Sequence, residues 1–511
     1  MVISTVPSTR TSRLLVLVAL AMMASMAALD QGLVWLLLLP LAGAGSPALG
    51  LRHSPYVIQL EGGDTVGEYF TMVHVGEPPL PFRVQIDTGS STLFVAAAGC
   101  MKCSEHATQL YDVSQSTSGR RIGCDDAMCK VATCQSPFCP STCAASKIAS
   151  HACCSARASA DCGFGVQYAG GSSVQGALVQ DTIRLGSLTA NATFGRTLEQ
   201  GGPWHGVVDG IFGMAMAALD CTPTCTKPLL ADLVAQHSLD DAFSMCLSDA
   251  SGWLVVGGVD AQFRSGPFVT TPMVKSSGDK YLFYRIEFTG LALGAHPVTM
   301  PRLSDAFPTA IGQESQSAVF STAIVDSGTT LLLLPTELFV NMVNMFKSSF
   351  AHLDGVLGRS GAPSAIDVAG VDGTQTCLGS APISGEAQGG WPLLRLQVGP
   401  NLELEIPAYL YFTRTGNVWC FGIQPVASGA AIFGDTVLRG FYVAYDHKKE
   451  LIGFAPSNAK KCGFPGAGGV NGPPASRDDA LPFLALLNSF VPFFAISFCS
   501  SGCDTGFSQL D

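Results

Sequence analysis

Two short stretches carry residue types that are suited to acid–base chemistry. Asp87 follows the apolar run Val84-Gln85-Ile86 and precedes a Thr-Gly-Ser sequence, and Asp326 follows Ala323-Ile324-Val325 and precedes Ser-Gly-Thr. Each run predicts a buried strand, and the glycine near each aspartate predicts a tight turn. A carboxylate at the end of a buried strand is costly unless it is hydrogen-bonded or catalytic. One copy alone would be an ordinary strand end, so the second copy is what makes the pair a candidate site.

Two carboxylates that lie close together can activate one water molecule. They cannot both ionise cheaply, so they share a proton. The ionised carboxylate takes a proton from water, and the other donates a proton to a carbonyl oxygen. We therefore expect Asp87 and Asp326 to be a catalytic pair that hydrolyses a carbonyl compound. Because water is the nucleophile, we expect no cofactor and no metal.

The residues around each aspartate are expected to support the pair. Ser90 and Thr329 are placed to bond the carboxylate of their own turn, while Thr88 and Ser327 are placed to bond the opposite turn. The turns themselves depend on glycine. The expected supporting residues are Thr88, Gly89, Ser90, Ser327, Gly328 and Thr329.

These two turns, as they stand, resemble those of the pepsin-type aspartic proteases. The resemblance covers roughly residues 66–462. It implies a mainly β, bilobal pepsin-like fold in which two lobes are related by a pseudo-two-fold axis. It also implies an aspartic-type endopeptidase whose partners are protein or peptide substrates, and we expect a monomer. Short apolar strands and 56 glycines agree with an all-β architecture.

A hairpin is expected where this family carries the flap that covers the substrate. Residues 165–176 read as strand, Gly/Ser turn and strand, continuing to Leu185, and Tyr168 matches the family's substrate-binding tyrosine. Without the aspartate pair, this would be an ordinary surface hairpin. The segments 209–214 and 431–435 repeat each other, and in the resembled fold such a strand crosses behind each catalytic turn. From Leu331 to Phe346 the apolar density predicts a helix that begins around Pro335.

Within the family, the chain is most similar to the nepenthesin-like and plasmepsin V-like branch. It shares the Cys-rich insert at 100–162, the Tyr168 to Gly176 spacing and the pattern Gly99-Cys100-x-x-Cys103-x-x-His106. Plasmepsin V-like enzymes are endoplasmic-reticulum proteases that cut exported proteins after a basic-x-Leu motif. The resemblance therefore suggests a processing protease of the secretory pathway.

The chain departs from these relatives at several positions near the expected cleft. Phe94 stands where pepsins commonly carry tryptophan. Where plasmepsin V has a free flap cysteine and an acidic residue, this chain has Ala169 and Gly170, and a second acidic position falls near Thr108, Gln109 and Glu105. These departures leave the protease prediction intact and put basic-x-Leu selectivity in doubt.

The insert at 100–162 holds ten of the eighteen cysteines. In a reducing compartment, Cys100, Cys103, His106 and His151 would suggest a zinc site. Behind a signal sequence, disulfides are the better interpretation. Outside the insert, the resemblance to pepsins implies the bridge Cys377–Cys420, and the resemblance to membrane-bound relatives implies Cys246–Cys462, with Cys221–Cys225 left as a local loop. Asn191-Ala192-Thr193 is an N-glycosylation sequon.

Composition and flanking segments predict entry into the secretory pathway. Charged residues make up only 13% of the chain, and the net charge of −11 argues against a nucleic-acid partner. Two apolar runs within residues 1–45 predict a signal sequence or an anchor. Residues 46–67 contain no lysine, so we expect no lysine-rich prosegment.

We expect six consecutive segments along the chain. The first is the leader at 1–45; it is followed by an N-terminal lobe at 56–245 that carries the insert, a C-terminal lobe at 246–462, a Gly/Pro linker at 463–479, an apolar segment at 480–498 and a polar tail at 499–511. The apolar segment is long enough to span a bilayer only barely. We expect membrane association, with a secreted or vacuolar protein as the alternative.

Two other functions fit the same sequence features. Plant xylanase inhibitors resemble this fold and bind proteins without catalysis, although both aspartate turns are complete in the present chain. A membrane-tethered sheddase or a vacuolar protease would use the same chemistry on different substrates.

Overall fold

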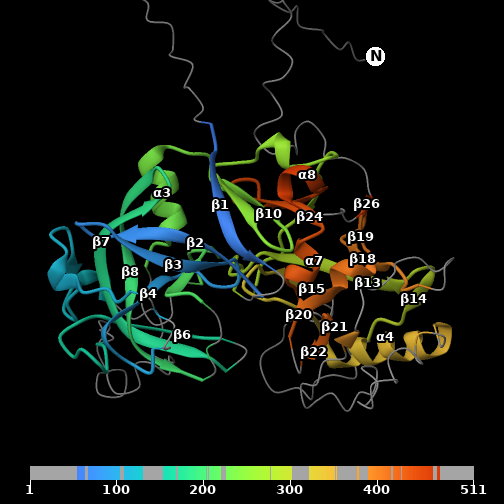
Figure 1. Ribbon diagram of the computed structural model, residues 1–511, viewed down its shortest axis with the longest axis horizontal. Coiled ribbons are helices and arrows are strands. Elements are labelled where there is room, and N and C mark those ends of the chain that lie inside the picture. The colour runs from blue at the N-terminus through green and yellow to red at the C-terminus, as the bar shows by residue number, and fades with distance from the viewer. Residues whose placement is uncertain are drawn as a thin grey trace, which may run out of the picture. The chain divides into compact units, whose positions relative to one another are not determined.

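The structure is a computed structural model (Figure 1). It describes residues 54–471 except 64–66, 104–106, 108, 130–153, 169–170, 203, 205–206, 220–225, 277, 302–321, 351–352, 354–376, 379–389, 416–417, 427–428 and 464–468. The expected leader, the apolar segment at 480–498 and the tail therefore lie outside the described residues. Within the ranges given above, no helix combines the length and the hydropathy that a membrane crossing requires.

Strands dominate the described part of the chain (Figure 1). The larger sheet has 14 strands among the described residues, and β1 joins its two parts by pairing with β11 on one side and β2 on the other. The order is β12 (Val269–Pro272), β25 (Leu451–Pro456), β24 (Phe441–Asp446), β10 (Ala242–Leu247), β11 (Gly252–Val256), β1 (Tyr56–Gly63), β2 (Glu68–Val75), β3 (Leu80–Asp87), β9 (Gly210–Gly213), β4 (Leu93–Met101), β8 (Leu188–Gly201), β7 (Ser173–Leu185) and β5 (Arg120–Arg121), with β6 (Gly163–Gln167) beside β7.

The C-terminal half adds two smaller sheets and most of the helices of the described ranges. One sheet runs β22 (Ile423–Val426), β16 (Leu332–Pro335), β23 (Ala431–Phe433), β15 (Thr322–Val325), β13 (Arg285–Leu293), β18 (Leu394–Val398), β19 (Leu402–Ile406) and β26 (Gly469–Asn471), with β14 (His296–Val298) on β13; the other is β17 (Cys377–Leu378), β21 (Val418–Phe421) and β20 (Phe412–Thr415). The helices are α3 (Leu229–His237), α4 (Thr336–Ser349), α6 (Ala408–Tyr411), α7 (Asp435–Leu438) and α8 (Ala459–Cys462), with 3-10 turns η1 (Val113–Gln115), η2 (Ala127–Cys129) and η3 (Ala261–Phe263).

Alternation of apolar and polar residues explains the strands of the second half. In β18 and β19, buried leucine, valine or isoleucine alternates with half-exposed polar residues. Side chains of a strand point to opposite faces in turn, so one face of each strand enters the core. Each such buried side chain contributes about 1.5–3 kcal/mol of apolar transfer free energy.

The same three-strand motif occurs once in each half of the chain. Strand β3 runs parallel to β9, which lies antiparallel to β4. Likewise β15 runs parallel to β23, which lies antiparallel to β16. This confirms the expectation that the repeated apolar-Gly segments cross behind the two aspartate turns. The mainly β, pepsin-like fold class is confirmed with it.

The helix expected to begin around Pro335 is α4, which begins at Thr336, whereas the apolar residues 332–335 before it form β16 and pair with β22 and β23. Sheet pairing thus overrides the helix preference of leucine. Strand β1 was not anticipated, because only Ile58 and Leu60 mark its buried face. The lobe boundaries 56–245 and 246–462 stay predictions.

Candidate active site

The two aspartate turns face each other through their glycines. A Cβ atom on Gly89 would lie 2.7 Å from both carboxylate oxygens of Asp326, and a Cβ on Gly328 would lie even closer to Oδ1 of Asp87. Only glycine lets each turn approach the opposite carboxylate this closely. The structure therefore brings Asp87 and Asp326, predicted from separate halves of the chain, into one site.

Each carboxylate is held by its own turn in the same way. The Gly89 N–H donates to Asp87 Oδ1 at 2.7 Å and the Ser90 hydroxyl donates to Oδ2 at 2.5 Å. In the second turn, the Gly328 N–H donates to Asp326 Oδ1 at 2.8 Å and the Thr329 hydroxyl donates to Oδ2 at 2.6 Å. In both turns, Oδ1 is bound by a backbone N–H and Oδ2 by a hydroxyl.

A second set of bonds ties the turns to each other. The Thr88 N–H donates to Ser327 Oγ at 3.2 Å, and the Ser327 N–H donates to Thr88 Oγ1 at 2.9 Å. The two hydroxyls then donate to the carbonyls of Val325 at 3.0 Å and Ile86 at 2.8 Å. Thr88 and Ser327 are both buried. Every polar atom of these two side chains is thus used to fix the separation of the carboxylates.

The electrostatics of the pair favour one shared proton. Asp87 is 4% exposed and Asp326 is 9% exposed. Burial is the main cause that raises the pKa of Asp87 well above its usual range, and the neighbouring charge of Asp326 raises it further. Hydrogen bonds from Ser90 and Gly89 lower that pKa to a smaller extent. A protonated acid beside an ionised carboxylate is the arrangement that acid–base hydrolysis requires.

Each turn is also supported from behind. The Met214 N–H, which follows β9, donates to the carbonyl of Asp87 at 2.7 Å. In the second half, the Asp435 N–H donates to the Thr329 carbonyl at 2.9 Å, and the Thr436 N–H donates to the Thr330 carbonyl at 3.1 Å. The first turn of α7 therefore supports the second aspartate turn.

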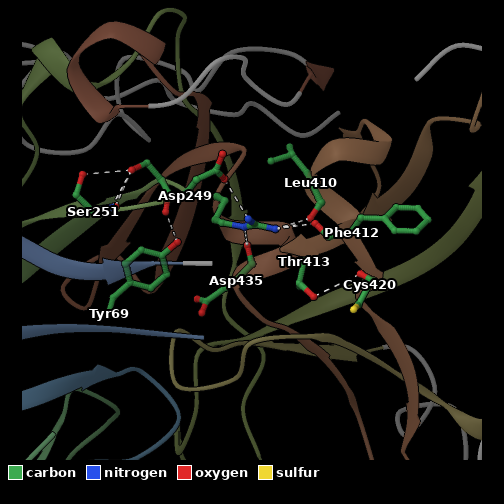
Figure 2. Close-up of polar contacts among 10 residues, drawn as sticks. Tyr69, Asp249, Ser251, Leu410, Phe412, Thr413, Cys420 and Asp435 are labelled. Atoms are coloured by element: carbon green, nitrogen blue, oxygen red, sulfur yellow. Dashed lines mark hydrogen bonds and ion pairs between the residues drawn. The ribbon is translucent and has the colours of Figure 1, made fainter. Parts of the chain in front are cut away.

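Arg439 ends the same helical segment and is fully buried. Its guanidinium donates to Asp249 Oδ1 at 3.1 Å and to the carbonyls of Leu410 and Phe412 at 2.8 and 3.3 Å. Figure 2 shows that Asp249 and the pair Leu410 and Phe412 come from two separate segments, because α6 continues directly into β20. Arg439 thus joins α7 to the turn between β10 and β11.

The predicted flap is a hairpin of β6 and β7. At its tip, the Tyr168 N–H donates to Ser172 O at 2.9 Å and the Gly171 N–H donates to Tyr168 O at 3.0 Å. Burial, followed by the charge of Asp87, raises the pKa of Tyr168 well above its ordinary value, while the Ser90 hydroxyl lowers it. The Tyr168 side chain packs against the buried cluster that contains Phe94 and Phe164. Residues 169–170 of the tip lie outside the described residues.

Trp204 is a residue of this site that the sequence did not single out. Its ring meets the ring of Tyr168 edge-on at 5.9 Å and that of Phe94 edge-on at 6.4 Å. Its indole N–H donates to the Gly201 carbonyl at 3.0 Å. The available signal was a tryptophan in a Gly/Pro-rich loop just ahead of the 209–214 motif.

Disulfides join the insert to the base of the flap. Among the described residues of the insert, the bridges are Cys100–Cys103, Cys124–Cys154 and Cys129–Cys162. Cys129 and Cys162 are fully buried in one apolar cluster with Phe94 and Phe164. Cys162 directly precedes β6. With Cys100 bonded to Cys103, the zinc alternative loses two of its four ligands. His106 and His151 lie outside the described residues.

The other predicted disulfides and the glycosylation sequon lie outside the insert. The structure joins Cys246 to Cys462 and Cys377 to Cys420, whereas Cys221 and Cys225 lie outside the described residues. Asn191 is exposed on β8, and its backbone bonds the side chain of Gln236. Glycosylation of Asn191 stays a prediction. Disulfides of this number indicate a secretory or vacuolar route.

A duplicated strand–Asp–Gly turn beneath a tyrosine-tipped hairpin defines an aspartic protease of the pepsin type. The sequence profile of the eukaryotic aspartyl protease family matches residues 68–127 and 131–457, and the chain belongs to this family. It is therefore an aspartic-type endopeptidase that acts on protein or peptide substrates.

The chain is similar to several plant enzymes. It is 27% identical to aspartic proteinase 36 of Arabidopsis thaliana over 77% of this chain and 75% of that protein. It is 26% identical to aspartic proteinase 39 of the same plant, over 88% and 89%. It is 24% identical to the aspartic proteinase nepenthesin-1 of Nepenthes gracilis, over 78% of each chain. This agrees with the nepenthesin-like resemblance.

Proposed function

We propose that Asp87 and Asp326 are the catalytic aspartates and that the enzyme cleaves proteins of the secretory or vacuolar route. The observation that carries this proposal is the reciprocal contact of each carboxylate with the glycine of the opposite turn. In the proposed step, one water oxygen attacks the peptide carbonyl carbon while Asp326 takes a water proton and Asp87 donates its proton to the carbonyl oxygen. The C–N bond then breaks as the leaving nitrogen takes the proton held by Asp326, and a hydroxyl proton of the tetrahedral diol returns to Asp87, which leaves a carboxylic acid, an amine and the starting pair.

Tyr168 is proposed to cover the bound peptide. Tyr168 lies at the tip of the flap, and its ring contacts that of Trp204. Burial raises the pKa of Tyr168, and the charges of both aspartates raise it further. A closed flap excludes water and orients the scissile bond, and both effects raise turnover.

Substitution of either aspartate tests this assignment. Asp87→Asn and Asp326→Asn keep the shape of the turn but remove the shared proton chemistry, so turnover of a peptide substrate should fall at least about 100-fold. Asp279→Asn is a matched control, because Asp279 is an exposed aspartate whose side chain is 85% accessible. Near wild-type turnover in either aspartate variant, with the control unchanged, would refute the dyad, whereas a wild-type protein without any turnover would favour the inhibitor-like alternative.

The narrower plasmepsin V-like function is cleavage after a basic-x-Leu motif in the endoplasmic reticulum. Assays with peptides that carry this motif would test it. A second candidate, an acid-compartment protease such as a vacuolar enzyme, is favoured by the buried acids. Burial raises the pKa of Asp87, Glu68 and Asp446. Folding therefore favours their protonated forms, and stability should be greater at acidic pH. The substrates would be identified by comparing the newly cleaved N-termini in cells that carry the wild-type protein with those in cells that carry Asp326→Ala. Membrane association of the enzyme is a separate prediction.

A further inference from the structure

Tyr284 contacts the support of both aspartate turns. It lies just before β13 and is fully buried. Its carbonyl accepts a hydrogen bond from the N–H of Val325, the residue before Asp326, at 2.9 Å. Its hydroxyl donates to the carbonyl of Met214 at 2.5 Å. Because the Met214 N–H binds the carbonyl of Asp87 at 2.7 Å, one tyrosine reaches both turns through one intermediate residue each.

The Tyr284 hydroxyl has a second neighbour, the imidazole of His447. Nε2 of His447 lies 2.7 Å from the hydroxyl oxygen, and the two rings stack at 5.7 Å with an interplanar angle of 11°. On its other side, Nδ1 of His447 lies 2.8 Å from Oδ1 of Asp241. The backbone N–H of His447 also donates to the backbone carbonyl of Asp241 at 3.1 Å. A continuous chain thus runs from Asp241 through His447, Tyr284 and Met214 to Asp87.

The hydrogen-bond geometry determines where the protons of this chain lie. A phenol has one O–H, and a carbonyl can only accept. When the Tyr284 hydroxyl donates to Met214, His447 Nε2 must carry a proton and donate to the phenol oxygen. The His447 hydrogen bond lowers the pKa of Asp241, so the carboxylate is ionised and Nδ1 must donate to it as well. Both ring nitrogens are then protonated, and His447 is an imidazolium.

Loss of one proton from His447 forces one bond of the chain to break. The bond to ionised Asp241 keeps a proton on Nδ1, so Nε2 becomes an acceptor. The Tyr284 hydroxyl then turns to donate to Nε2 and leaves the Met214 carbonyl. The titratable groups that face this site are Asp241 from the segment before β10, Tyr284 from the segment before β13, and Asp446 of β24. Burial raises the pKa of Asp446, and the charge of His447 opposes that rise in part. Tyr445 of β24 packs edge-on against Tyr284 at 4.6 Å.

We propose that Tyr284 is a positioning residue for both aspartate turns and that the Asp241–His447 ion pair directs its hydroxyl proton to Met214. The activity consequence rests on the proposed dyad. In acid, the hydroxyl holds Met214 and, through it, the backbone of Asp87. When His447 is neutral and its Nε2 accepts instead, this support is released, and turnover falls while peptide binding is kept.

The kinetic test compares Tyr284→Phe with wild type between about pH 4 and 8. Tyr284→Phe removes one hydroxyl and keeps the ring and backbone, so kcat should fall about tenfold in acid, the equivalent of one buried hydrogen bond, with KM little changed. The two activities should converge at high pH, where wild type has released Met214 too. His447→Gln should lower kcat in acid and show the same convergence.

Tyr442→Phe is the matched control. Tyr442 is a buried tyrosine on β24 whose hydroxyl binds Ser244 and Asp260 instead, so the Tyr442→Phe variant should keep the wild-type pH profile.

A second measurement does not depend on catalysis. In ¹⁵N-histidine-labelled protein, the His447 resonances, assigned by their loss in His447→Gln, should show both ring nitrogens protonated at acidic pH. A neutral His447 under those conditions would overturn the inference, as would an activity ratio of Tyr284→Phe to wild type that stays constant at every pH. If Asp326→Asn were active, the proposed dyad would fail, whereas the nitrogen spectrum would still report on the Tyr284–His447 chain.

Discussion

Thr88 and Ser327 exchange their backbone N–H groups and hydroxyl oxygens across the two aspartate turns, with donor–acceptor distances of 3.2 and 2.9 Å. Each residue follows an aspartate directly. A shift of either turn must therefore break bonds in the other turn, which makes the two carboxylates one rigid unit. This coupling joins segments from opposite halves of the chain, and its loss should affect stability and turnover together.

Replacement of Thr88 tests this coupling. Thr88→Ala leaves the buried Ser327 N–H and Val325 carbonyl without that partner, so unfolding free energy should fall by about 2–4 kcal/mol. Turnover should fall as well, because the carboxylates lose their fixed separation. Thr88→Ser keeps the hydroxyl and is the matched control. Chemical denaturation and peptide hydrolysis provide the measurements, and equal behaviour of the alanine and serine variants would contradict the prediction.

Trp204 should position the flap tyrosine. Its ring contacts those of Tyr168 and Phe94 edge-on, and Phe94 stands where pepsins commonly carry tryptophan. Trp204→Ala should lower kcat/KM about tenfold or more, since one aromatic pair contributes about 0.5–1.5 kcal/mol beyond its buried area. Trp204→Phe should recover part of the loss.

A double-mutant cycle separates this role from general packing. If Trp204 acts through Tyr168, the variant that carries both Tyr168→Ala and Trp204→Ala should be little worse than Tyr168→Ala alone. Trp253→Phe is the control, because Trp253 packs beside Phe263 and donates to the Lys461 carbonyl instead. Additive losses in the cycle would show that Trp204 does not act through the flap.

The aspartate turns and the flap hairpin could be predicted because their signals are local. Strand, aspartate and glycine are adjacent in the chain, and the second copy removes the ambiguity of the first. The contacts of Trp204 and of Tyr284 with His447 could not be predicted in this way. Their partners are separated by many residues, and the β-sheet order alone brings them together. A tyrosine in an apolar stretch has the same sequence signature whether its hydroxyl is structural or functional.

Arg439 should be the more costly residue of its ion pair to remove. It is fully buried, whereas the side chain of Asp249 is 40% exposed. Arg439→Met leaves the buried carbonyls of Leu410 and Phe412 without this donor, so unfolding free energy should fall by about 2–4 kcal/mol. Asp249→Asn keeps an acceptor near water and should cost about 1 kcal/mol. Thermal or denaturant unfolding of both variants gives the comparison, and a larger loss for Asp249→Asn would be inconsistent with the buried contacts of Arg439.

Glu68 should make stability depend on pH in one direction. Burial raises the pKa of Glu68 from an ordinary value of 4.5 to about 7, against a smaller lowering effect of the Val207 N–H. A raised pKa means that the folded protein holds the proton more tightly than the unfolded chain. The stabilisation is therefore complete below about pH 4.5 and is lost as pH rises to about 7, a loss of about 3 kcal/mol for this group.

Replacement of Glu68 by glutamine tests this dependence. The Glu68→Gln side chain stays neutral and keeps an acceptor for the Val207 N–H. The stability of this variant relative to wild type should therefore increase by about 3 kcal/mol between pH 4 and 8, as measured by urea denaturation. Glu61→Gln, at an exposed position of β1, should show no such trend, and parallel pH curves for wild type and Glu68→Gln would rule out a titrating Glu68.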